Sequence, residues 1–120
     1  MMNTVYNKGL HILATIHTSN IALLQNGEVF LTELNNKITV LDLHNLHGHL
    51  HHFDGGGYTG IVCLTESHIA FHTWPEFQLL TLDIYLSNFM RDNSEKARTL
   101  ADFCANFFEA NKVDLQEVFR

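Results

Sequence analysis

The segment IVCLTESHIAFHTWPE, residues 61–76, is central to the sheet that this chain is expected to form. Its two apolar runs, residues 61–65 and 69–73, are rich in β-branched and aromatic side chains, which is typical of strands. The only Trp and the only Pro of the chain, Trp74 and Pro75, follow the second run. We therefore expect a strand over each run, with Glu66 and Ser67 between them.

Further strands are expected on both sides of this segment. Residues 8–17 alternate between apolar and polar side chains, which predicts a half-buried strand. Residues 38–43, 48–53, 79–86 and 113–119 are also predicted to be strands.

Two helices complete the pattern. The first follows a cap at Ser19 or Asn20 and is weakened by about 1 kcal/mol by Gly27; its apolar positions are Leu23, Phe30, Leu31 and Leu34. The second is capped by Asn93 or Ser94 and ends near residue 111; its apolar stripe is Ala97, Leu100, Ala101, Cys104, Phe107 and Phe108. The order β-α-β-β-β-β-β-α-β predicts an α+β fold, a two-layer sandwich with helices packed on one face of a mostly antiparallel sheet. The other face is free for a partner or a second protomer.

Length and composition restrict the class of protein. The 120 residues suit one domain, residues 1–120, and 46% hydrophobic with 17% charged residues is typical of a globular chain. The formal net charge of −6 argues against a nucleic-acid partner. No apolar run is long enough for a membrane span and the N-terminus lacks a signal-peptide pattern, so we expect a cytoplasmic protein without a membrane partner. Cys63 and Cys104 lie in apolar patterns, which predicts buried free thiols.

The motif ESHxxxHTWPE, residues 66–76, resembles the self-cleavage segment of the prokaryotic S-adenosylmethionine decarboxylases. The resemblance extends to His52-Phe53, to GYTG at residues 57–60, to the strand of Asp83 and, more weakly, to a G-x-H pattern at Gly9 and His11. It implies that Ser67 attacks the carbonyl of Glu66, that the chain splits between these residues, and that Ser67 becomes a pyruvoyl group. In that family the pyruvoyl ketone forms a Schiff base with S-adenosylmethionine and accepts electrons as carbon dioxide leaves, which supplies spermidine synthesis.

The resemblance also implies roles for individual residues. His72 and Thr59 match residues that assist self-cleavage, Thr59 replacing the usual serine. Phe53 matches an aromatic that stacks on adenine, and Glu76 matches a glutamate that binds the ribose hydroxyls. Ser87 stands where the family usually has a cysteine that returns the proton, and a serine is a far weaker acid than a thiol, whose pKa is about 8.5. By the same resemblance the mature enzyme is a homodimer with active sites at the interface.

Two changes leave alternatives open: Ser87 replaces the cysteine, and Asp54-Gly55-Gly56-Gly57 replaces the usual L-P-x-G. The same fold and cofactor could act on another amino acid, such as arginine or ornithine, or the chain could be an uncleaved, non-catalytic paralogue. The alternating His47, His49 and His51 could bind zinc or copper, but no matched cysteine or carboxylate spacing supports a metal. We expect solvated or interface histidines instead.

Overall fold

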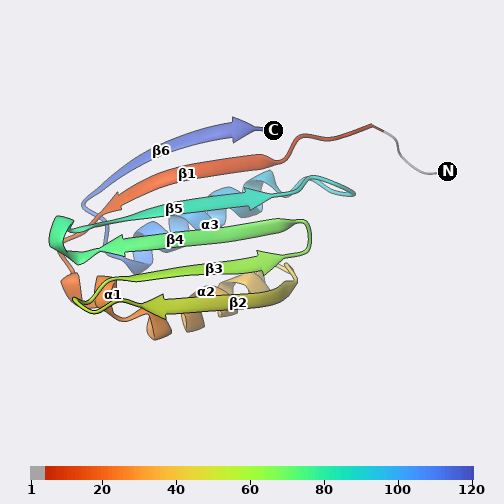
Figure 1. Ribbon diagram of the computed structural model, residues 1–120. Helices are drawn as coiled ribbons and strands as arrows, with labels where there is room; N and C mark the ends of the chain where they lie inside the picture. Colours follow the sequence, from red (N-terminus) through yellow and green to blue (C-terminus); the bar gives the residue numbers. More distant parts are fainter. Residues whose placement is uncertain (1–4) are drawn as a thin grey trace.

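The computed structural model describes residues 5–120, and within this range six strands form one sheet. Their order across the sheet is β2-β3-β4-β5-β1-β6, and every neighbouring pair is antiparallel (Figure 1). The strands are β1 Leu10–His17, β2 Asn45–His52, β3 Tyr58–Leu64, β4 Ser67–Trp74, β5 Leu79–Leu86 and β6 Lys112–Phe119.

Three helices, α1 Ile21–Gln25, α2 Gly27–Val40 and α3 Ser94–Phe107, cover one face of this sheet (Figure 1). The predicted α+β fold with helices on one face of an antiparallel sheet is confirmed. No helix of residues 5–120 is both long and apolar enough to cross a membrane.

The two faces of the sheet differ because side chains alternate along each strand. In β5 every second residue is buried against the helices, and β1 follows the same alternation. The intervening residues point to the opposite side, which the helices leave uncovered (Figure 1). We call this second side the open face.

The strand predicted over residues 38–43 is wrong, because residues 38–40 are the last turn of α2 and the chain then turns towards β2. Phe30, Leu34 and Ile38 follow one another at a spacing of four residues, and all three are fully buried. This helical stripe outweighs the strand preference of the β-branched residues 38–40. The described part of the chain accordingly has one strand fewer than predicted.

The first predicted helix is divided into α1 and α2 at Asn26. The Asn20 side chain accepts the Leu23 N–H and caps α1, while the Asn26 side chain accepts the Val29 N–H and caps α2. Gly27 therefore begins a helix rather than weakening the middle of one. A Cβ on Gly27 would lie 2.9 Å from Leu50 Cδ1, so only glycine lets the start of α2 approach β2 this closely.

The remaining elements follow the sequence closely. β5 has the predicted bounds, and α3 buries the predicted positions Ala97, Leu100, Ala101 and Cys104. The prediction that Cys63 is a buried thiol is wrong, because Cys63 is exposed. The buried residues of β3 are Tyr58, Gly60, Val62 and Leu64, so the alternation places Cys63 on the open face.

Candidate active site

Ser67 is the first residue of β4 and follows a tight turn from β3. Leu64 pairs with Ser67, so Thr65 and Glu66 alone form the connection. Glu66 has a φ of 58°, in the left-handed region that a side chain disfavours by roughly 1–2 kcal/mol. Backbone strain therefore lies at the residue whose carbonyl precedes Ser67.

The hydroxyl of Ser67 is held by the end of β5. Ser67 Oγ accepts a hydrogen bond from the backbone N–H of Ser87 at 2.9 Å. Ser87 Oγ in turn accepts the N–H of Phe89 at 3.1 Å. The antiparallel pairing of His68 with Tyr85 brings these two strand ends together.

A pocket of about 320 Å³ opens beside Ser67; its lining includes Tyr6, His11, Glu66, Ser67, His68, Tyr85 and Arg120. The rings of His11, His68 and Tyr85 lie about 6 Å from one another, with centroid separations of 5.9, 6.0 and 6.2 Å. Within residues 5–120 the buried Nε2 of His11 has no hydrogen-bond partner, and Asp83 Oδ1 lies 3.9 Å away. The pocket wall thus contains an imidazole nitrogen whose hydrogen-bonding capacity is unused within these residues.

Electrostatics favour a neutral imidazole beside Ser67. Burial, and then the neighbouring His11, lower the pKa of His68, while Asp83 acts in the opposite direction. The pKa of Tyr85 is raised, chiefly by its hydrogen bond with Tyr6. At neutral pH both aromatic groups are therefore uncharged.

A second cluster occupies the other end of β3 and β4. Thr59 pairs with His72 across the strands, and Thr59 Oγ1 makes a short hydrogen bond with His72 Nδ1. The Thr59 hydroxyl also lies 3.3 Å from the carbonyl of Phe71. The ring of Trp74 lies 6.0 Å from that of His72.

This second cluster borders another pocket, of about 330 Å³; its lining includes Phe53, Asp54, Gly55, Gly57, Tyr58, Thr59, His72, Thr73, Trp74 and Glu76. Phe53 is about half exposed. Gly57 is required here, because a Cβ on it would lie 2.8 Å from the carbonyl oxygen of Thr73. An aromatic ring and a carboxylate thus border one pocket.

The structure divides the predicted site residues between these two places. Glu66, Ser67 and Ser87 are together at one end of β4, whereas Phe53, Thr59, His72 and Glu76 are at the other. His72 is five positions further along β4 than Ser67, and at about 3.3 Å per residue their Cα atoms lie roughly 16 Å apart. One protomer does not bring the two groups into contact.

Comparison with known proteins identifies the family to which this chain belongs. The model of the S-adenosylmethionine decarboxylase family matches residues 10–120. This chain belongs to the S-adenosylmethionine decarboxylase family. A proenzyme of this name from a Hydrogenobaculum species is 32% identical over 106 residues, which cover 88% of this chain and 76% of the relative. One from Picrophilus torridus is 32% identical over 112 residues, covering 93% and 83%.

A solved structure gives the same result for the fold. The crystal structure of the adenosylmethionine decarboxylase from Aquifex aeolicus superposes with a TM-score of 0.84 at 30% identity and covers 97% of this chain and 92% of that chain. As a member of this family, the chain is a carboxy-lyase whose family works through a pyruvoyl group made by self-cleavage.

Sequence reasoning missed His68 and Tyr85 as residues of the pocket beside Ser67. It also gave His11 no part in the site. The signal was present, because Cys63, His68, Tyr85 and His11 pair successively across four strands and so form one row. This row can be recognised in the sequence only if the register of each strand pair is already known.

Two histidines of β2, His49 and His51, belong to the open face as well. His49 pairs with Ile61 and His51 with Thr59, so both point away from the helices, and both are exposed. His52 has the opposite orientation and its Nε2 accepts the N–H of Gly27. No group of three potential ligands within residues 5–120 is arranged to hold a metal ion.

Proposed function

We propose that this chain is an S-adenosylmethionine decarboxylase proenzyme that splits itself between Glu66 and Ser67. The observation that carries the proposal is the geometry at this bond: a left-handed Glu66 followed by a Ser67 whose hydroxyl is fixed by the Ser87 N–H, beside a pocket.

The proposed cleavage takes place in three steps. Ser67 Oγ attacks the carbonyl carbon of Glu66 while a base takes the hydroxyl proton; the peptide C–N bond then breaks, the nitrogen gains a proton and an ester remains. Removal of the Ser67 Cα proton expels the Glu66 carboxylate, which releases residues 1–66. The dehydroalanine left on the second fragment takes up water and releases ammonia, leaving a pyruvoyl group before His68.

The strain and the hydrogen bond support the first step. Strain at Glu66 favours rearrangement of its peptide. The Ser87 N–H orients Ser67 Oγ and strengthens its bond as negative charge develops on that oxygen.

We further propose that His72 and Thr59 reach Ser67 from a second copy of the chain. Two copies can pack with their sheets facing each other, related by a two-fold axis that is parallel to the sheets and perpendicular to the strands. The Ser67 end of one sheet then lies opposite the His72 end of the other. The open face carries exposed apolar side chains that such packing would bury, namely Leu13, Ile61, Trp74 and Val118. A homodimer would thus form two complete sites.

Substrate would lie between the two pockets of such a dimer. We assign the adenine to Phe53 and the ribose hydroxyls to Glu76, since a carboxylate can accept two hydrogen bonds from a diol. The pyruvoyl group, once formed, supplies the carbonyl that accepts electrons as carbon dioxide leaves. The pocket beside Ser67 suits the pyruvoyl group, because its wall is partly aromatic and includes His11 Nε2, which has no hydrogen-bond partner within residues 5–120.

Intact mass spectrometry of the denatured protein tests the proposal. We expect two fragments, residues 1–66 and a second that begins with a pyruvoyl group followed by residues 68–120, whereas Ser67→Ala stays as one chain. Release of carbon dioxide from carboxyl-labelled S-adenosylmethionine, but not from arginine or ornithine, identifies the substrate. A wild-type chain that stays whole after prolonged incubation contradicts the proposal.

A further inference from the structure

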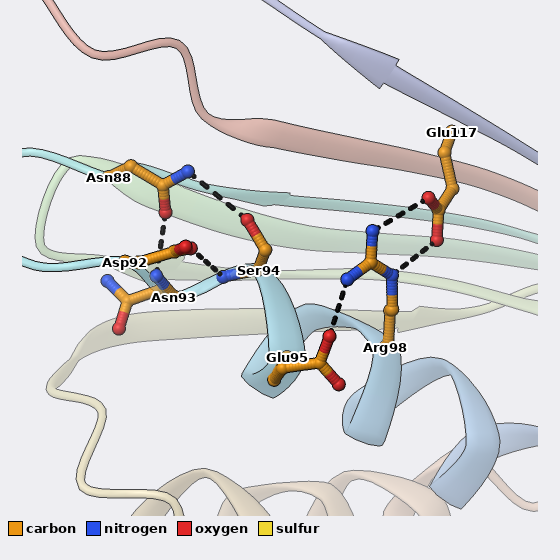
Figure 2. Close-up of polar contacts among 7 residues, drawn as sticks. All are labelled: Asn88, Asp92, Asn93, Ser94, Glu95, Arg98 and Glu117. Carbon is orange, nitrogen blue, oxygen red and sulfur yellow. Dashed lines mark hydrogen bonds and ion pairs between the residues drawn. The ribbon is translucent and has the colours of Figure 1, made fainter.

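The loop that follows β5, residues 87–93, is closed by its own side chains (Figure 2). The N–H of Asn93 donates to Asn88 Oδ1 at 2.7 Å. The Asn88 amide donates to the carbonyl of Lys8 at 2.9 Å and lies 3.3 Å from Ser94 Oγ. These bonds fix the loop to the N-terminal segment and to the start of α3.

Asn93 occupies the cap position of α3 but does not cap the helix. An asparagine there normally accepts a backbone N–H of the first turn. Here the carboxylate of Asp92 accepts the N–H of Ser94 at 2.9 Å, and the Asn93 side chain makes no cap bond. The Asn93 amide instead donates to the carbonyl of Ser87 at 2.8 Å, and its own Oδ1 is buried without a hydrogen-bond partner among residues 5–120.

Ser87 is consequently held at its carbonyl by Asn93 and at its hydroxyl by the Phe89 N–H. Its own N–H is the group that holds Ser67 Oγ. A continuous set of hydrogen bonds therefore runs from the start of α3 to the hydroxyl of Ser67. Asn93 is the residue that connects α3 to Ser87 in this set, and its side chain does not make the usual cap interaction.

We propose that Asn93 is a positioning residue for self-cleavage at Ser67, acting through Ser87. The inference rests on the proposed function and adds a residue from outside both pockets. By fixing the carbonyl of Ser87, Asn93 holds the adjacent N–H in line with Ser67 Oγ. Loss of the Asn93 amide lets Ser87 rotate, so the hydroxyl loses its orientation and the donor that stabilises negative charge on the attacking oxygen.

The test compares Asn93→Ala with Asp92→Ala. Freshly made chains are followed by intact mass spectrometry, and thermal unfolding is measured on each variant combined with Ser67→Ala so that all chains are uncleaved. We expect Asn93→Ala to lengthen the half-time of cleavage at least tenfold. Asp92→Ala removes the helix cap and lowers the unfolding temperature, but it leaves the half-time within about twofold. Equal slowing by both variants means that the loop only needs to be folded, which overturns the inference.

Hydroxylamine separates the attack step from the later elimination, because it cleaves an ester and leaves a peptide bond intact. If Asn93 positions Ser67 for attack, little ester forms in Asn93→Ala and hydroxylamine does not restore its cleavage. Restoration to the wild-type rate places the defect after the attack and contradicts the inference. Asn93→Asp, which keeps the size and removes the donor, should behave like Asn93→Ala and serves if the alanine variant does not fold.

The outcomes also separate this inference from the proposed function. A wild-type chain that splits while Asn93→Ala splits equally fast contradicts the inference alone. A wild-type chain that never splits contradicts the proposed function, and the inference fails with it.

Discussion

The backbone N–H of Ser87 donates a hydrogen bond of 2.9 Å to the hydroxyl of Ser67, and so joins the end of β5 to the start of β4. Position 87 is where the family usually has its proton-returning cysteine, and here it is a serine. The residue is thus adjacent to the cleavage site even though its side chain has changed. We propose that its backbone serves self-cleavage, whereas its side chain slows the later return of the proton.

Ser87→Cys should raise the rate of decarboxylation at least tenfold and leave self-cleavage unchanged. A correctly placed general acid contributes roughly 10²–10⁴-fold, and a thiol is a far stronger acid than a hydroxyl. Turnover of S-adenosylmethionine and the mass of the fragments are measured on the same sample. Ser87→Ala is the matched control, and a rate for Ser87→Cys no higher than wild type shows that another group returns the proton.

Glu66→Gly should slow self-cleavage, because glycine adopts the φ of 58° without strain and the peptide loses that reason to rearrange. The half-time of splitting is followed by mass spectrometry, with Glu109→Gly as a control that removes a carboxylate and relieves a similar φ of 54° outside both pockets. Cleavage of Glu66→Gly at the wild-type rate would mean that strain at residue 66 has no part in the reaction.

Phe53→Ala and Glu76→Gln should weaken substrate binding without affecting self-cleavage. A hydrogen bond to a charged group contributes about 1.5–3 kcal/mol, so we expect KM to rise roughly 10- to 100-fold for Glu76→Gln. Phe77→Ala removes an exposed ring outside the pocket lining and should leave KM unchanged. An unchanged KM in both pocket variants contradicts the assignment of adenine and ribose.

Thr73→Val should destabilise the fold by about 2 kcal/mol or more, because buried groups lose their partners. Thr73 Oγ1 accepts the N–H of Tyr58 at 2.9 Å and donates to the carbonyl of Leu24 at 2.8 Å, which ties β3 and β4 to α1. Urea unfolding is measured in chains that also carry Ser67→Ala, so that all remain uncleaved. Thr81→Val on the open face is the control, and equal stability of the two variants contradicts this role of Thr73.

Stability should fall as the pH decreases from about 6.5, the ordinary pKa of histidine. The pKa of His68 is lowered in the folded chain, chiefly by burial, so between the lowered and the ordinary value the unfolded chain binds more protons. Protonation therefore favours unfolding, with Asp83 opposing this effect and His11 and Arg120 adding to it. In the uncleaved Ser67→Ala chain, His68→Asn should reduce the dependence of the free energy of unfolding on pH in this range. An unchanged slope contradicts the role given to His68.

Sequence patterns predicted the elements in which local periodicity and tertiary burial agree. β5 and α3 belong to this group, because alternation in one and a helical stripe in the other mark the faces that are buried. Residues 38–40 were misassigned because their β-branched side chains favour a strand, while the position of Ile38 one turn after Leu34 puts it in the core as part of a helix.

The candidate site was less predictable than the fold. The resemblance named Ser67, His72 and Glu76, but their spacing in the sequence does not reveal that a strand of about 3.3 Å per residue holds the first two apart. The side chain of Asn93 illustrates a second limit. Its place before α3 predicts a helix cap, whereas its contacts with Ser87 and Asn88 depend on how the loop is folded.

The most direct test of a site shared between two copies is complementation of Ser67→Ala by His72→Ala. Neither chain should split when it is produced alone. When the two are produced together, mixed dimers contain one site with an intact Ser67 and the partner's intact His72, so the His72→Ala chain should be cleaved and the Ser67→Ala chain should stay whole. If both chains remain intact in purified mixed dimers, the two ends of β4 do not complete one another across an interface.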